Sequence, residues 1–329
     1  MSTPTTAFKG FDKNLSCRGF QYAEGATYEH PGTVDVCRAG FHAVTLPLDA
    51  FRYYKPSESV YHQVELEGVV SEAGGDSKVA GKKITVGASL NMFGLVKAHV
   101  EAVWNLAKKP GKASQEAKAT TGYSAHAATT GDSAHAATTG DYANAATTGY
   151  SANAATTGDY ANAATTGYSA NAATTGYSAH AATTGYSANA ATTGDYANAA
   201  TTGYSAHAAT TGYSAHAATT GRYAHAATTG RYAHAATTGR YAHAATTGRY
   251  ANAATTGYSA HVRASVGDEG SIAAVLGQGA ARGAVGCWLV LTERDDTWNV
   301  LGVQAVQVDG DTVEAGVYYT LRGGKVVKA

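Results

Sequence analysis

The chain has 329 residues with 24 basic and 24 acidic side chains, and therefore a formal net charge of zero. This balance gives no net attraction to nucleic-acid phosphates or anionic lipids, so we expect neither nucleic acid nor a membrane as a partner. No apolar run is long enough to span a bilayer, and residues 1–13 lack the apolar stretch of a signal peptide. These features predict a cytoplasmic protein.

Residues 1–112 are predicted to form a small α+β head. Residues 61–66 alternate between apolar and polar side chains, as a strand does, and short strands are also expected around residues 34–36 and 40–43. Residues 48–54 favour a short helix. The clearest helix is predicted over residues 89–108, where apolar side chains recur on one broad face and Ser89 can cap the start.

The head also contains candidates for a nucleophile and a base, namely His30, His42, His62 and Cys37. No nucleophile elbow, phosphate-binding loop or metal-ligand spacing accompanies them. We therefore expect core cysteines, strand-edge histidines, and surface charges at Lys9, Asp12 and Glu65. The sequence predicts no catalytic residue, no cofactor and no metal site, and hence no enzyme.

The cysteines bear on the compartment as well. Cys17 and Cys37 could pair under oxidising conditions, but without an export signal we expect both, and Cys287, to be reduced. Three cysteines at these spacings also make a poor zinc site.

A nine-residue repeat dominates the middle of the chain. From Gly122 to Gly257, sixteen glycines lie at nine-residue intervals in the frame Gly-x-x-Ala-(His/Asn)-Ala-Ala-Thr-Thr. A fixed period of this kind indicates a repeat architecture. When positions are counted from the residue after glycine, positions 1, 2 and 4 vary and the others do not.

Each repeat is predicted to contain a strand. Neighbouring strand residues point to opposite faces, so the alanines at positions 3 and 5 lie opposite the side chain at position 4. We expect the invariant small residues inside, the variable polar residues outside, and glycine at the corner, where φ can be positive. Glycine and two threonines in every nine residues exclude an α-helix. Disorder is the alternative, because the repeats lack Leu, Ile, Val and Phe.

Two repeats, eighteen residues, are predicted to make one flattened coil. Alternate repeats sort into like runs at position 4, where Asn153, Asn171 and Asn189 precede a run of histidines that starts at His207. Stacking in an eighteen-residue coil would produce such runs. Sixteen repeats give about eight coils, roughly 38 Å in length at a strand spacing of about 4.8 Å.

Residues 287–329 are predicted to form an antiparallel β cap that covers the open end of the repeats. Just before it, Gly267, Gly277 and Gly286 suggest degenerate terminal coils. The predicted fold is therefore mainly β. It is a parallel β-solenoid of nonapeptide repeats over residues 113–286, with two repeats per coil, between the α+β head and the antiparallel cap.

Several short motifs resemble those of an uncharacterised bacterial and phage protein family. In the head these are Lys9-Gly10-Phe11-Asp12, Cys17-Arg18-Gly19-Phe20-Gln21-Tyr22, and Cys37 with Gly40-Phe41-His42. Members of that family carry nonapeptide repeats of the Thr-Gly-x-Tyr-Ser-Ala type and a tail similar to residues 288–291 and 318–321. The resemblance implies an architecture and no established activity.

The outside of the predicted solenoid carries ladders of Tyr, His and Asn, with acidic residues in its first part and basic residues in its last part. An antiparallel pair of solenoids would set these opposite charges against each other, and a two-fold dimer is the simplest such arrangement. The predicted interaction surface consists of Tyr150, Tyr168, Tyr186, Tyr204, His207, His225, His243, His261, Asp141, Asp159, Asp195, Arg222, Arg231, Arg240 and Arg249.

The sequence leaves three functions open. We expect a structural, self-assembling protein that binds copies of itself, as a homodimer or a higher assembly, or another protein. The first alternative is a binder of a regular lattice such as ice or a polysaccharide. The second is an enzymatic head with the solenoid as a spacer.

Overall fold

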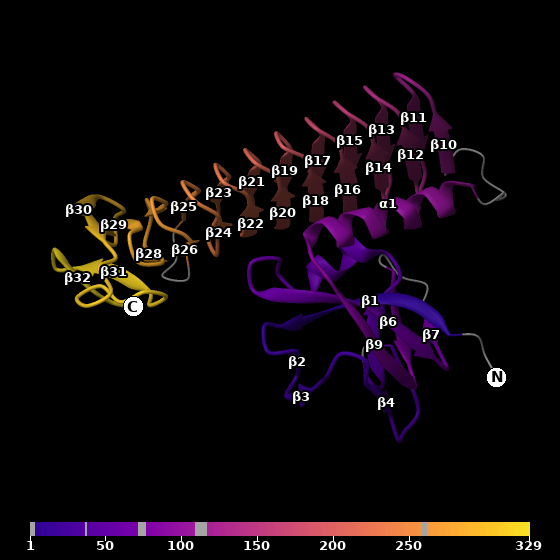
Figure 1. The fold of residues 1–329 in the computed structure, drawn as a ribbon, viewed down its shortest axis with the longest axis horizontal. Coiled ribbons are helices and arrows are strands. Elements are labelled where there is room, and N and C mark those ends of the chain that lie inside the picture. Colours follow the sequence, from indigo (N-terminus) through magenta and orange to yellow (C-terminus); the bar gives the residue numbers. More distant parts are fainter. Residues whose placement is uncertain (1–3, 37, 72–76, 109–116, 258–261) are drawn as a thin grey trace. The chain divides into compact units, whose positions relative to one another are not determined.

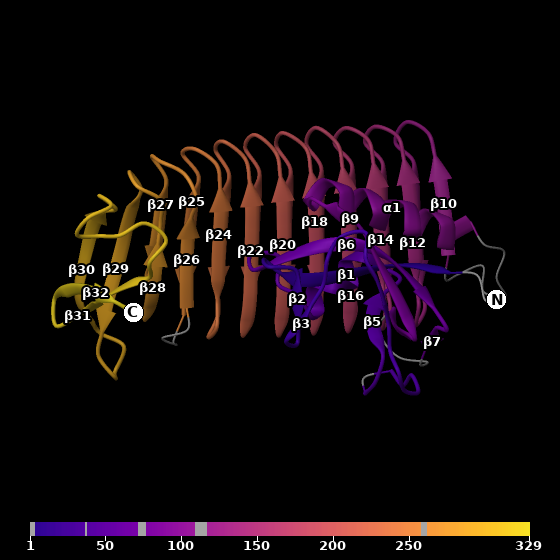
Figure 2. The same ribbon diagram turned by 60° about the horizontal axis from the view of Figure 1, so that its bottom comes forward.

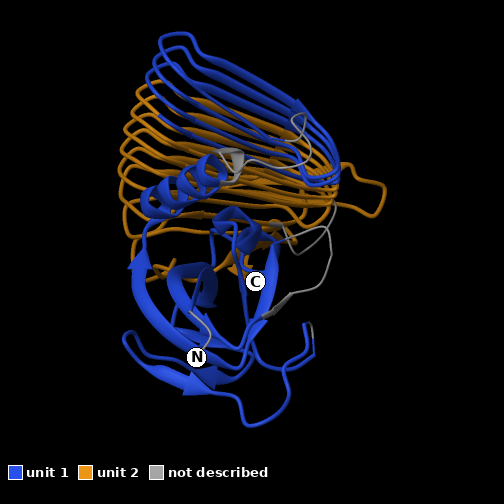
Figure 3. Ribbon diagram, turned by 90° about the vertical axis from the view of Figure 1, so that its right-hand side faces the viewer, with its two compact units in different colours: residues 1–175 blue, residues 176–329 orange. Residues whose placement is uncertain are grey.

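The computed structural model describes residues 4–36, 38–71, 77–108, 117–257 and 262–329. The chain divides into two compact units, Met1–Thr175 and Gly176–Ala329 (Figure 3). The fold is mainly β and contains a parallel β-solenoid of about nine turns from residue 117 to residue 291, which confirms the predicted fold class. Within the described ranges, no helix is both long and apolar enough to cross a membrane.

The head of the first unit is an antiparallel sheet with the strand order β4-β9-β6-β1-β5-β8-β7. Its strands are β1 (Thr5–Asp12), β4 (Thr27–Glu29), β5 (Phe41–Val44), β6 (Ser59–Glu67), β7 (Val70–Ser71), β8 (Lys78–Gly81) and β9 (Lys83–Leu90). A separate hairpin joins β2 (Ser16–Cys17) to β3 (Phe20–Gln21). The predicted strand over residues 61–66 lies within β6, whereas residues 34–36 contribute only an isolated bridge between Asp35 and Ala39.

Two helices complete the head. The short helix η1 (Pro47–Arg52) is a 3₁₀-helix and lies where a short helix was expected. The long helix α1 (Met92–Lys108) begins later than predicted, because Ser89 still belongs to β9, where it pairs with His62 of β6. Asn91, and not Ser89, caps the helix: its Oδ1 accepts a hydrogen bond of 2.8 Å from the backbone N–H of Gly94.

The first coils of the solenoid belong to the same unit as the head. Their strands alternate between two sheets, and parallel neighbours pair residues eighteen apart, as Asn153 does with Asn171. This register confirms that two repeats make one coil. The strands are β10 (Ala117–Thr121), β11 (His126–Thr130), β12 (His135–Thr139), β13 (Asn144–Thr148), β14 (Asn153–Thr157), β15 (Asn162–Thr166) and β16 (Ser169–Thr175).

In the second unit the strands again alternate between two sheets, and Figure 2 shows the sheet of even-numbered strands. The coil strands of this unit are β17 (His180–Thr184), β18 (Ser187–Thr193), β19 (Asn198–Thr202), β20 (Ser205–Thr211), β21 (His216–Thr220), β22 (Tyr223–Thr229), β23 (His234–Thr238), β24 (His243–Thr247), β25 (Asn252–Thr256), β26 (Val262–Val266), β27 (Ile272–Val275) and β28 (Gly279–Arg282). The last three pair in parallel like the regular coils, so the degenerate coils expected after Gly257 are present.

The interior of the coils is built from small side chains. The alanines at positions 3 and 5 are buried, as Ala197 and Ala199 are, and the threonine at position 7 is buried beside them, as Thr201 is. The expected inward face is therefore confirmed, with one threonine per repeat added to it. Strand alternation explains the addition, because positions 3, 5 and 7 share one face.

Glycine is required at both coil corners because the preceding coil lies too close for a side chain; a Cβ at Gly140 would overlap the carbonyl oxygen of Gly122. At one corner the backbone has positive φ, with 139° at Gly140 and 141° at Gly158, as the sequence suggested. At the other corner φ is not positive, and the close approach of the preceding coil is the reason for glycine. A Cβ at Gly203 would overlap the carbonyl oxygen of Gly185.

The tail forms two antiparallel hairpins. β29 (Trp288–Arg294) pairs in parallel with β27 and antiparallel with β30 (Val300–Gln307). β31 (Tyr319–Arg322) instead pairs with β28 and with β32 (Lys325–Lys328). Each of the two tail hairpins thus extends a different sheet of the solenoid, because each sheet offers an unpaired edge to the chain that follows it.

Helix α1 packs against the even-numbered strands of the first unit (Figure 1). Val103 of α1 and Leu46 lie in one apolar cluster with Ala137 and Ala155, which point outward from β12 and β14. A hydrogen bond joins the head to the same coils: Asn171 Nδ2 donates to the buried Asp49 carboxylate at 3.1 Å. The head therefore covers the outward side of these coils.

Candidate functional site

The odd-numbered strands present an open outer face. In the second unit, positions 4, 6 and 8 of β17, β19, β21, β23 and β25 point outward and are exposed or half-buried, while positions 5 and 7 are buried. The outward side chains form one row of His or Asn, one of alanine and one of threonine. We call this surface the open face. Strands β11, β13 and β15 of the first unit carry the same pattern.

Tyrosine ladders run along the corners of the coils. In the first unit Tyr150 and Tyr168 stack with ring centroids 4.9 Å apart and planes within 2° of parallel. In the second unit Tyr186, Tyr204, Tyr223 and Tyr241 form a continuous series with centroid spacings of 4.9, 5.3 and 4.8 Å. Stacked aromatic pairs at this distance stabilise neighbouring coils.

The tyrosine of a corner occupies either position 1 or position 2. When it is at position 1, serine follows, as in Tyr186-Ser187, and when it is at position 2, Asp or Arg precedes it, as in Arg222-Tyr223. The ladder continues across this change, because Tyr204 at position 1 contacts Tyr223 at position 2. The predicted surface included only tyrosines at position 1 and so omitted Tyr223 and Tyr241, although the exchange between Tyr-Ser and Asp/Arg-Tyr is visible in the sequence.

The charged residues of the predicted surface lie at the same corners. Asp141, Asp159 and Asp195 are exposed. The four arginines lie over tyrosine rings: the guanidinium carbons of Arg222, Arg231, Arg240 and Arg249 are 5.3 to 5.6 Å from the nearest ring centroid. Arg249 also forms a 2.8 Å ion pair with Glu269. These contacts orient the arginines along the ladder.

The predicted histidines occupy a different environment from the tyrosines. His207, His225 and His243 stack at 5.1 and 4.7 Å on even-numbered strands, close to the spacing expected for a coil ladder. His207 and His225 are only 3% and 2% exposed, so neither offers a free surface. His261 lies outside the described residues.

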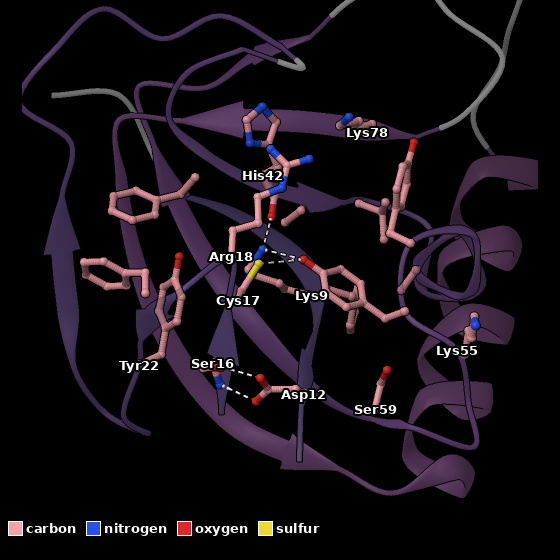
Figure 4. Close-up of a pocket in the computed structure, with 18 of the residues that line it drawn as sticks. Lys9, Asp12, Ser16, Cys17, Arg18, Tyr22, His42, Lys55, Ser59 and Lys78 are labelled. Atoms are coloured by element: carbon pink, nitrogen blue, oxygen red, sulfur yellow. Dashed lines mark hydrogen bonds between the residues drawn. The ribbon is translucent and has the colours of Figure 1, made fainter. Parts of the chain in front are cut away.

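A second site lies in the head, where a cavity of about 650 Å³ opens beside β1 (Figure 4). Lys9 points into it and is 4% exposed, which corrects the expectation of a surface charge. Its Nζ donates hydrogen bonds to the carbonyl oxygen of His42 at 2.9 Å and to the Tyr54 hydroxyl at 3.0 Å. Cys17 Sγ lies 3.1 Å from the same hydroxyl.

Local features of the sequence create this arrangement. Gly10 leaves room for the Tyr54 ring, which a Cβ at that position would overlap. Arg18 and Gly19 both have positive φ, 50° and 78°, and make the two-residue turn between β2 and β3 at the cavity wall. The Asp12 carboxylate accepts hydrogen bonds from the backbone N–H groups of Asn14 and Ser16, which holds the start of this hairpin.

Burial shifts the pKa values of three groups that line the cavity. Burial lowers the pKa of Lys9, and the nearby charges of Arg18 and Lys78 lower it further, against an opposing effect of Cys17. The pKa of His42 is lowered by burial first and then by Lys78, Lys9 and Arg18. Burial also raises the pKa of Tyr54, with a further contribution from the contact with Cys17. Neighbouring cations thus lower the pKa values of both Lys9 and His42.

Comparison with known proteins adds a family for the head alone. Residues 5–98 match the model of a domain of unknown function, DUF7666. No curated protein and no solved structure matches the chain. The match supports the part of the predicted resemblance that concerns an uncharacterised domain family at the head. The solenoid with its stacked aromatic ladders is consistent with a structural or binding repeat protein.

Proposed function

We propose that this chain is a self-assembling structural protein whose open face binds a second copy of itself. The observation that supports this proposal is the open face, where rows of small polar and apolar side chains recur with every coil and tyrosine ladders lie at the corners. A flat surface without long flexible side chains loses little side-chain entropy when it is covered. The proposal assigns no reaction to the chain.

Charge favours a second copy over an unrelated protein. In chain order the acidic corner residues Asp141, Asp159 and Asp195 precede the basic residues Arg231 and Arg249. An antiparallel partner of the same sequence therefore brings acidic corners toward basic ones, and a two-fold interface is self-complementary. We also propose that the repeats and the tail share the family of the head, as their resemblance to the bacterial and phage proteins suggests.

The oligomeric state of the purified chain tests this proposal. Sedimentation velocity at micromolar concentration should show a dimer or a larger assembly, and the variant Ala218→Arg, which puts a long cation at the centre of the open face, should shift it to monomer. The matched control is Ala315→Arg, at an exposed position of the tail. A monomeric wild-type chain would contradict self-assembly, and an assembly that survives Ala218→Arg would contradict the open face as its interface.

A further inference from the structure

Three motifs singled out in the sequence converge on the head cavity. The first supplies Lys9 and Asp12, the second supplies Cys17, Arg18 and Phe20, and the third supplies Gly40, Phe41 and His42. They come from β1, from the β2–β3 hairpin and from the start of β5. Contacts within the solenoid use none of them. Their common location indicates a separate role for the cavity.

The cations of the cavity outnumber the carboxylates that could balance them. Its lining contains the cations Lys9, Arg18, Arg38, Lys55 and Lys78, and the carboxylates Asp12 and Glu58. Asp12 accepts hydrogen bonds from the hairpin that follows it, and Glu58 lies 3.8 Å from Lys55 Nζ. Arg38 lies 3.8 Å from Asp35. Among the described residues, no carboxylate oxygen lies within 4 Å of Lys9 Nζ or of the Arg18 guanidinium.

Lys9 is the central group because a buried cation normally has a counter-ion. An ammonium group has three N–H donors, and Lys9 uses two of them on neutral acceptors, the His42 carbonyl and the Tyr54 hydroxyl. The third has the Cys17 thiol as a weak acceptor, which a stronger acceptor on a ligand would replace. An oxyanion placed there would provide the missing negative charge, and Figure 4 shows Arg18 and His42 on the same side of the cavity.

The remaining wall is aromatic and partly exposed. Phe20 and Tyr53 line the cavity and are each 45% exposed, and Phe41, the first residue of β5, is half-buried. Lys78 Nζ lies 4.9 Å from the centroid of the Tyr53 ring. Aromatic faces of this kind suit a flat, apolar body, whereas the cations suit an anionic group at its end.

We propose that the head cavity binds a small organic anion, with its oxyanion group on Lys9 and Arg18 and its flat apolar part among Phe20, Phe41 and Tyr53. A carboxylate and a phosphate ester share the chemistry that these residues recognise. The proposal is independent of self-assembly, since every residue that it uses lies in the head.

Calorimetric titration of the full chain with three probes tests the proposal. Benzoate and phenyl phosphate carry the anion, and benzyl alcohol is their neutral counterpart. We expect at least one anion to bind, with an affinity at least tenfold higher than that of benzyl alcohol and an affinity that falls as salt is added. The tighter of the two anions identifies the preferred group.

Two variants locate the site. Lys9→Met keeps the length of the side chain and removes the charge, so the dissociation constant should rise about tenfold or more, the usual effect of losing a hydrogen bond to a charged group. The control Lys13→Met, at an exposed lysine outside the cavity, should bind as the wild type does. Arg18→Met, at an exposed turn, should also weaken binding. If Lys9→Met fails to fold, the Arg18→Met variant tests whether the anion binds in this cavity. Equal binding of anions and benzyl alcohol, no binding of either anion, or unchanged binding in the folded variants would overturn the proposal.

Discussion

Single buried residues determine how the first unit responds to acid. His99 of α1 is fully buried, and its Nδ1 accepts a hydrogen bond from the backbone N–H of Leu48 at 3.4 Å. Burial lowers the pKa of His99 to about 3, and the proximity of His135 contributes in the same direction. The pKa of His135 is also lowered by burial, although the charge of Asp49 opposes this shift. Both rings are therefore neutral in the folded protein at neutral pH.

We expect His99 to make the stability of the folded chain depend on pH. Above pH 6.5 the ring is neutral in the folded and the unfolded chain, so its contribution to stability is complete there. Between about pH 6.5 and pH 3 only the unfolded chain takes up the proton, so stability falls as the pH falls, by about 2 kcal/mol between pH 6.5 and pH 5. Urea unfolding of the wild type and of His99→Gln over this range should show a smaller loss in the variant.

The control for this measurement is His126→Gln, because His126 is exposed. It should leave the pH dependence of unfolding unchanged. If His99→Gln loses as much stability as the wild type between pH 6.5 and pH 5, then His99 does not control the response to acid.

At the scale of the element, the coil strand was predictable because its chemistry repeats. A strand has a period of two, so nine residues with small side chains at positions 3 and 5 define an inside, and like residues eighteen apart define the coil.

The head cavity was not predictable in the same way. β1 is a central strand whose residues Ala7 to Phe11 are all buried, so its sequence does not alternate, and Lys9 resembled a surface charge. The decisive contact with Tyr54 joins residues 45 positions apart.

The inward threonine of each coil strand gives the second prediction. Thr201 is buried in β19, and its hydroxyl has no hydrogen-bond partner among the described residues. An unsatisfied buried hydroxyl costs free energy, and valine has nearly the same shape without this cost. Thr201→Val should therefore raise the free energy of unfolding by about 1 kcal/mol, measured by chemical denaturation.

The adjacent residue provides the control for this substitution. Thr202 belongs to the same strand but points outward and is exposed, so Thr202→Val should change stability by less than about 0.5 kcal/mol. Destabilisation by Thr201→Val would mean that the hydroxyl has a partner inside the coil.

At the scale of the whole molecule, the chain does not divide where its sequence changes character. The repeats begin well before residue 175, yet Met1–Thr175 forms one compact unit that contains both the head and the first coils. Two kinds of contact explain this: Val103 and Leu46 pack on Ala137 and Ala155, and Asn171 donates to Asp49. Alanine-lined coils bury little apolar area of their own, so the head supplies the larger side chains that cover their outer side.

The last prediction follows from this shared unit. Val103 is fully buried in the contact, and Val103→Ala should cost about 2 kcal/mol through the lost apolar area and the cavity left behind. If the head and the first coils open together, backbone amides in β6 and in β14 should both exchange roughly 30-fold faster, since 1.4 kcal/mol corresponds to a factor of ten. Hydrogen exchange read by mass spectrometry measures both segments at once.

The control is Glu101→Ala, at an exposed position on the same helix, which should change the exchange of neither β6 nor β14. Faster exchange in β14 with β6 unchanged would show instead that the head folds independently of the coils that it covers.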